Sequence, residues 1–128
     1  MPKVLLIEDD DEARRSTGDL FRREDWTVLE AGDGQAGIDL AIKHRPDVIL
    51  CDLLMPGTNG FDVLDRLQGS SQTSHLPVVL FTIKQLTAEE KERLKGRVDA
   101  FAPKQGFKKE TLVGIVNQVL HHNAAEGI

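Results

Sequence analysis

Carboxylates stand at two places where short apolar runs of the sequence end. Glu8 and Asp9 follow the run VLLI at 4–7, and Asp52 follows the run DVILC at 47–51. A carboxylate at the end of a buried run carries a desolvation cost unless a neighbouring charge favours it. If these three acids meet, they repel one another, and a divalent cation relieves the repulsion. Because every ligand in such a set is oxygen, the pattern predicts an Mg²⁺ site.

Two further polar residues follow later apolar runs. Thr82 follows PVVLF at 77–81, and Lys104 comes shortly after Phe101. A hydroxyl and an ammonium group beside a metal-binding acid cluster favour a site that receives a phosphoryl group, because each can hold an oxygen of the developing charge. A carboxylate can itself be the acceptor and form an aspartyl phosphate. Asp52 is the predicted acceptor because it ends the central strand.

Five apolar runs alternate with segments of helical periodicity. The predicted strands cover residues 4–7, 26–30, 47–51, 77–81 and 98–102. Several are apolar almost throughout, which is typical of strands covered on both faces of a parallel sheet. The predicted fold class is therefore α/β: a single doubly wound (βα)5 flavodoxin-like domain with a five-stranded parallel sheet in the order 2-1-3-4-5. Functional groups then converge at the carboxyl ends of the strands.

The segments between the strands predict five helices. Their apolar faces are Ala13, Thr17, Leu20 and Phe21; Ala36, Leu40 and Ala41; Phe61, Leu64 and Leu67; and, in the last helix, Leu112, Ile115, Val116 and Val119. Thr87 and Glu90 form a capping box at the start of the fourth helix. Asp10 and Asp11 are predicted to start the first helix, where acids complement the helix dipole. The second strand ends at Glu30, which we do not identify as a reactive group.

Length, charge and cysteine content narrow the class of protein. The 128 residues fit one domain, predicted as residues 1–122 with a C-terminal tail at 123–128. A net charge of −5, from 21 acids and 16 bases, argues against direct binding to nucleic acid. The single cysteine, Cys51, fits a reducing compartment, and no apolar stretch is long enough for a signal peptide core or a membrane span. We therefore expect a cytoplasmic protein without a membrane partner.

The sequence resembles the receiver domain of two-component response regulators, chemotaxis regulators included, over essentially its full length. The resemblance rests on Glu8-Asp9, on Asp52-Leu53-Leu54-Met55-Pro56 with Gly60, on Thr82 and on Lys104. It implies that Asp52 accepts a phosphoryl group from a sensor histidine kinase or a phosphotransfer protein. The implied Mg²⁺ ligands are Glu8, Asp9, Asp52 and the backbone carbonyl of Leu54. Thr82 and Lys104 are implied to contact the phosphoryl oxygens.

The resemblance also implies a switch. Thr82 moves toward the phosphoryl group and Phe101 turns inward, which remodels the face made by the fourth helix, the fifth strand and the fifth helix. A downstream protein, or a second copy of the chain in a homodimer, would bind that face. Such a domain promotes its own phosphorylation and dephosphorylation but is not a turnover enzyme for an external substrate.

Some positions depart from the family pattern. Ile83 stands where the family usually has a small residue, and we expect it to restrict access to the acceptor. Gln105 replaces the usual proline after Lys104, which makes a cis peptide bond there much more costly. Phe101 lacks the hydroxyl of the tyrosine found in many relatives. Leu54 and Lys84 occupy positions that tune phosphate lifetime, and an apolar Leu54 predicts slow dephosphorylation because it cannot orient a water molecule.

Three other functions compete with this interpretation. A pseudo-receiver would have the same fold and act only by docking, as Ile83 and Gln105 would allow. A haloacid-dehalogenase-like phosphatase also uses Asp, Thr, Lys and Mg²⁺, and Asp9-Asp10-Asp11 has its D-x-D form, but that scheme leaves Asp52 without a role. A flavodoxin-like cofactor binder would place its phosphate against the acids from Glu8 to Asp11, which would repel it.

Overall fold

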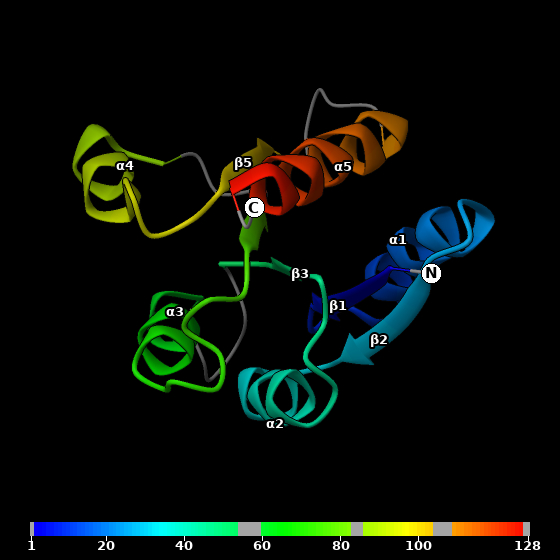
Figure 1. Cartoon of the computed structure of the whole chain (residues 1–128), viewed down its shortest axis with the longest axis horizontal. Coiled ribbons are helices and arrows are strands. Elements are labelled where there is room, and N and C mark those ends of the chain that lie inside the picture. The colour runs from blue at the N-terminus through cyan, green and yellow to red at the C-terminus, as the bar shows by residue number, and fades with distance from the viewer. Residues whose placement is uncertain (1, 54–59, 83–85, 104–108, 127–128) are drawn as a thin grey trace.

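A five-stranded parallel sheet forms the centre of the protein (Figure 1). The structure is a computed structural model that describes residues 2–53, 60–82, 86–103 and 109–126, without the side chains of 82, 102, 103, 109, 110 and 122–126. The strands are β1 (Lys3–Ile7), β2 (Thr27–Ala31), β3 (Val48–Cys51), β4 (Val78–Thr82) and β5 (Ala100–Pro103). Their order, β2-β1-β3-β4-β5, confirms the predicted fold class and topology. Each strand lies within two residues of its predicted bounds.

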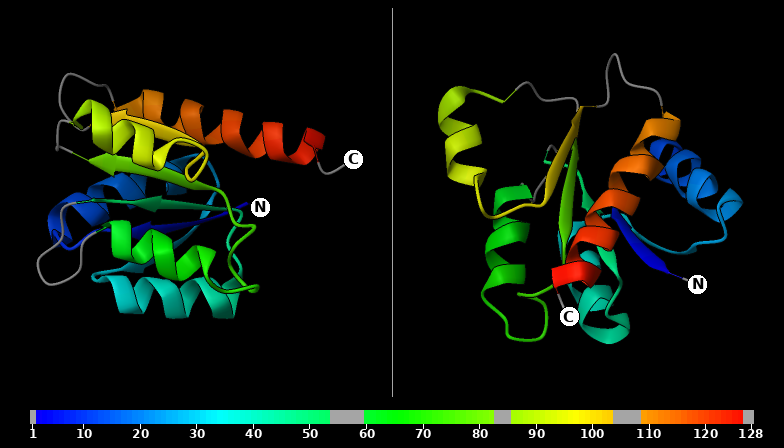
Figure 2. Two further views of the ribbon diagram at one scale, coloured as in Figure 1. Left: turned by 90° about the vertical axis from the view of Figure 1, so that its left-hand side faces the viewer. Right: turned by 45° about the horizontal axis from the view of Figure 1, so that its top comes forward.

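Helices cover both faces of the sheet (Figure 2). They are α1 (Asp11–Arg23), α2 (Gly34–His44), α3 (Gly60–Gln68), α4 (Ala88–Leu94) and α5 (Lys109–Glu126). One apolar core joins alternate strand residues such as Leu5 and Ile49 to α2, α3 and Leu94 of α4. The other joins Leu6 and Leu50 to α1 and α5. Because each strand is buried on both sides, the near-continuous apolar runs of the sequence are explained.

Local sequence signals set where several helices begin and end. The Asp10 carboxylate accepts a hydrogen bond from the Ala13 N–H at 3.0 Å, which confirms that this acid caps α1. Thr87 and Glu90 form the predicted capping box of α4. The helix α5 continues to Glu126, so the predicted tail begins inside the helix; alanine and glutamate at 124–126 favour this extension.

Two glycines allow helices to approach the sheet closely. A Cβ added at Gly37 of α2 would lie 2.5 Å from Cδ1 of Ile7, and one at Gly60 of α3 would lie 2.7 Å from Cα of Leu53. The sequence-predicted face of α2 does not include Gly37 or Ile38, although both are buried. Such close approaches depend on the packed arrangement, and helical periodicity in the sequence does not reveal them.

No helix in the described ranges has both the length and the apolar character that crossing a membrane requires.

Candidate functional site

Three acids meet at the carboxyl ends of β1 and β3. Glu8, Asp9 and Asp52 each offer a carboxylate oxygen, and these oxygens all lie within 4.8 Å of one another. The exposure of the three residues is graded, because Asp9 is exposed, Glu8 is half-buried and Asp52 is only 4% exposed. The structure thus brings together the acid cluster that the sequence predicts, with the predicted acceptor as its most buried member.

The sheet fixes the backbone that carries these acids. The Asp52 N–H donates a hydrogen bond to the Ile7 carbonyl at 3.1 Å, and the Glu8 N–H donates to the Ala31 carbonyl at 3.0 Å. Ile7 also stands opposite Cys51 in the parallel register of β1 and β3. The two acidic segments therefore leave neighbouring strands at the same level. Their convergence follows from strand order and register.

The donor set fits Mg²⁺. Three carboxylates at this separation carry like charges, and the partly buried surroundings strengthen their mutual repulsion. A hard divalent cation both neutralises the cluster and accepts oxygen ligands, while retaining several water molecules. The side chains of this group in the described residues all offer oxygen, which is the ligand type that magnesium prefers.

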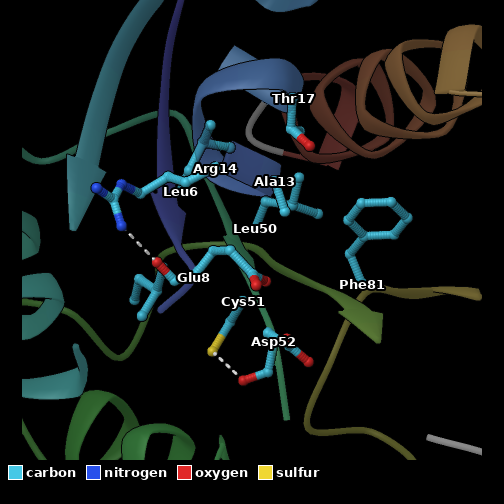
Figure 3. Close-up of a pocket in the computed structure, with 10 residues that line it drawn as sticks. Leu6, Glu8, Ala13, Arg14, Thr17, Leu50, Cys51, Asp52 and Phe81 are labelled. Carbon is cyan, nitrogen blue, oxygen red and sulfur yellow. Dashed lines mark hydrogen bonds between the residues drawn. The ribbon is translucent and has the colours of Figure 1, made fainter. Parts of the chain in front are cut away.

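An arginine beside the cluster was not identified from the sequence. The Arg14 guanidinium donates to the Glu8 carbonyl oxygen at 2.8 Å, as Figure 3 shows. It also pairs with Asp11 at 2.7 Å and with Glu30 at 3.2 Å. Burial disfavours the charged guanidinium, but hydrogen bonds and attraction from Asp11 and Glu30 outweigh that cost and raise the pKa of Arg14. Its position one turn beyond the acids, three residues after Asp11, is the only sequence signal that could have suggested this role.

The thiol of Cys51, next to Asp52, is in an environment that makes it unreactive. Cys51 is buried in β3, and its Sγ–H donates to the Asp52 carbonyl oxygen at 3.4 Å (Figure 3). Burial, together with the charges of Asp52 and Glu8, raises the pKa of the Cys51 thiol to about 12. A neutral thiol in this position is a poor nucleophile and a poor metal ligand. This agrees with the interpretation of Cys51 as a core residue.

A small cavity adjoins Asp52 on the side of the sheet that α1 covers. It has a volume of about 20 Å³ and is lined by Asp52, the buried Thr17, Phe81 and apolar side chains of β1 and β3 (Figure 3). That volume is enough for about one water molecule. The cavity is therefore too small for an organic cofactor.

Several predicted site residues lie partly or wholly outside the described residues. Those wholly outside are Leu54, Ile83, Lys84, Lys104 and Gln105. The backbone of Thr82 ends β4 opposite Pro103 of β5, at the same edge of the sheet as the acids. Phe101 of β5 is 41% exposed and so points outward.

Comparison with known proteins agrees with this architecture. The sequence profile of the response regulator receiver domain matches residues 4–117. The chain is 30% identical to the protein PilH of Pseudomonas aeruginosa, over 94% of this chain and 98% of PilH. It is 38% identical to the transcriptional regulatory protein AfsQ1 of Streptomyces coelicolor, but this match covers 66% of the chain and only 36% of AfsQ1.

A solved structure gives the same result. The chemotaxis protein CheY4 of Vibrio cholerae superimposes with a TM-score of 0.84 and 28% identity, and the match covers 93% of this chain and 98% of CheY4. The profile match spans most of the chain, and the similarity to PilH spans nearly all of both proteins. The chain therefore belongs to the response regulator receiver domains, the signalling modules of two-component and chemotaxis systems.

Proposed function

We propose that the chain is a phosphorylatable receiver domain in which Asp52 accepts a phosphoryl group from a histidine kinase or a phosphotransfer protein. The observation that carries this proposal is the acid cluster, in which the 4% exposed Asp52 has carboxylate oxygens of Glu8 and Asp9 within 4.8 Å. An acid buried at a strand end beside two others has a high desolvation and repulsion cost. That arrangement is understandable if the site is built for a cation and a phosphoryl group.

Each residue then has a defined task. Glu8, Asp9, Asp52 and the carbonyl of Leu54 would hold Mg²⁺, which supplies neutralisation of the charge on the phosphoryl oxygens. An Asp52 oxygen forms the new bond to phosphorus as the bond from phosphorus to the donor histidine nitrogen breaks, and the electron pair stays with the imidazole. Thr82 and Lys104 would contact the remaining phosphoryl oxygens. Thr82 is the last residue of β4, and Lys104 directly follows β5 in the sequence. These positions support the role, because both strands end at the edge that carries the acids.

The output would be a change of protein contacts. Phe101 is 41% exposed, and its ring would turn inward when Thr82 moves toward a phosphoryl group. The face made by α4, β5 and α5 would then bind a downstream protein or a second copy of the chain. The net charge of −5 supports a partner other than nucleic acid. We place this receiver domain at residues 1–122, in the cytoplasm, with Leu54, Ile83 and Lys84 tuning access and phosphate lifetime.

Intact-mass spectrometry tests the acceptor. The protein is incubated with Mg²⁺ and acetyl phosphate, and wild type is compared with Asp52→Asn and with the control Asp39→Asn, an exposed acid on α2. We expect one phosphate adduct in wild type and in the control, and none in Asp52→Asn.

A second arm covers the case in which Ile83 excludes the small donor. Ile83→Ala is treated with acetyl phosphate, and wild type is treated with a panel of phosphorylated histidine kinases. An adduct in either experiment that requires Asp52 supports the proposal. If none of these experiments gives an adduct, the proposal is wrong and the pseudo-receiver function takes its place.

A further inference from the structure

Arg14 holds the peptide bond that joins two of the acids. The carbonyl oxygen of Glu8, which accepts from Arg14 at 2.8 Å, belongs to the same planar peptide unit as the N–H of Asp9. On its other side, Glu8 is held by its own N–H, which donates to Ala31 of β2 at 3.0 Å. Rotation of the Glu8–Asp9 peptide would break the bond to Arg14. The guanidinium therefore restricts where both carboxylates can stand.

The guanidinium is itself fixed. Glu30 at the end of β2 accepts from Arg14 Nε at 3.2 Å, and Asp11 in the first turn of α1 accepts from another guanidinium nitrogen at 2.7 Å. The Arg14 side chain is only 17% exposed. Three donors in a rigid planar fork thus contact three separate segments of the chain, an arrangement that a lysine cannot reproduce.

We propose that Arg14 is a positioning residue for the acid site, which sets the Glu8–Asp9 peptide so that the carboxylates of Glu8, Asp9 and Asp52 are placed for a divalent cation. This inference rests on the proposed function in so far as that cation is Mg²⁺. Arg14 contacts a main-chain atom and not a carboxylate of the cluster, so it acts through Glu8 and Asp9.

Loss of the Arg14 charge and loss of its contact with the Glu8 carbonyl should change the affinity for Mg²⁺ in opposite directions. Removal of a positive charge near the cluster should strengthen Mg²⁺ binding through Coulomb's law alone. Loss of a group that orients metal ligands typically weakens binding by about 10- to 100-fold. A positioning role thus predicts weaker binding when Arg14 is replaced by a neutral residue, and an electrostatic role predicts the reverse.

Arg22 supplies a matched control. It pairs with Glu30 at 2.5 Å and with Asp19 at 2.9 Å, and so belongs to the same ionic network as Arg14. Within the part of the chain that the structure describes, Arg22 donates to Asp19 and Glu30 and not to the Glu8 carbonyl. Arg22→Gln removes the same charge from the network and leaves the Glu8–Asp9 peptide held.

Two measurements on the full chain test the proposal. Mg²⁺ affinity is measured by calorimetric titration of wild type, Arg14→Gln, Arg14→Lys and Arg22→Gln. Exchange of the Glu8 amide hydrogen is measured by NMR in the metal-free proteins. We expect Mg²⁺ binding to weaken about tenfold or more in both Arg14 variants and to stay within about twofold in Arg22→Gln. Exchange at Glu8 should accelerate only in the Arg14 variants. Thermal melts confirm that each variant folds. If Arg14→Gln does not fold, the comparison of Mg²⁺ affinities uses Arg14→Lys alone.

The outcomes separate this inference from the proposed function. Unchanged or tighter Mg²⁺ binding in Arg14→Gln would overturn the positioning role, even if exchange accelerates or the melting temperature falls. Equal weakening in Arg22→Gln would also overturn it. If wild type binds no Mg²⁺ while exchange accelerates only in the Arg14 variants, the Mg²⁺ assignment is wrong and the positioning of the acids is supported.

Discussion

Replacement of Asp9 by asparagine should stabilise the metal-free protein and remove most of its stabilisation by Mg²⁺. Asp9 is the most exposed of the three clustered acids, and its carboxylate lies within 4.8 Å of those of Glu8 and Asp52. Asparagine has nearly the same shape and lacks the charge. The substitution therefore removes repulsion from the folded state while it disturbs packing little.

The magnitude follows from the separation of the charges. Two unit charges 4.8 Å apart interact by about 1 kcal/mol in a water-like dielectric and by about 3.5 kcal/mol at an effective dielectric constant of about 20. The lower value applies because Asp9 is exposed. Repulsion between Asp9 and its sequence neighbour Glu8 persists in the unfolded chain, so the pair with Asp52 decides the result. We expect the free energy of unfolding to rise by about 1 kcal/mol, and the melting temperature by roughly 4 °C for a domain of this size.

Mg²⁺ should remove most of this difference in stability between wild type and Asp9→Asn. At a free Mg²⁺ concentration ten times its dissociation constant, a cation that binds only the folded state adds about 1.4 kcal/mol of stability. Wild type gains this increment, and Asp9→Asn should lose most of it. The two proteins should therefore melt several degrees apart in EDTA and at similar temperatures in Mg²⁺.

Differential scanning calorimetry in EDTA and in Mg²⁺ measures both effects. Glu92→Gln, at an exposed acid on α4, controls for the loss of one negative charge and should keep the full Mg²⁺ shift. A lower melting temperature for Asp9→Asn in EDTA would contradict the repulsion argument. Equal Mg²⁺ shifts in wild type and Asp9→Asn would show that Asp9 does not bind the cation.

Two further predictions concern the surroundings of the acceptor. Gly60→Ala should destabilise the protein by about 1–3 kcal/mol, because the new Cβ would lie 2.7 Å from the Leu53 backbone. Gly114→Ala has open space around its new Cβ and should stabilise helix α5 by about 0.5–1 kcal/mol. Urea unfolding of both variants measures these changes. Since the pKa of the Cys51 thiol is raised from 9.0 to about 12, the unfolded state loses the thiol proton first as pH rises, and stability should fall between these values. Urea unfolding of Cys51→Ala over the same range should show a shallower decline, and an identical slope would refute the shift.

The parts of the site that depend on strand order could be predicted from sequence. Apolar runs without alternation indicated a parallel sheet, and such a sheet sends all its strand ends to one edge. Once β1 and β3 are neighbours, Glu8 and Asp52 must approach each other, and the structure confirms this. The starts of α1 and α4 could also be predicted, because Asp10 and Thr87 cap these helices through local hydrogen bonds.

Contacts between side chains of different elements could not be predicted in this way. Glu30 was identified only as the end of the second strand, yet it binds Arg14 and Arg22 of α1. That pairing depends on how α1 lies across β2. Hydrophobic periodicity indicates which face of α1 packs on the sheet, but it does not give the position or angle of the helix relative to β2. The role of Gly37 could not be predicted for a related reason, because the lack of a side chain there matters only when α2 packs closely against Ile7.

The arrangement around Asp52 shows why a costly site is tolerated in a small domain. Clusters of like charges in partly buried surroundings are normally avoided, and departures from that rule tend to mark functional positions. Here the acids stand on backbone that is fixed by Ile7, by Ala31 and by the Arg14 guanidinium. Because this backbone is held, the carboxylates can move apart only by side-chain rotation, and the repulsion that remains favours the binding of a cation. These backbone hydrogen bonds keep the acids close together in the metal-free protein despite their repulsion. They therefore also position the carboxylate oxygens for the chemistry proposed at Asp52.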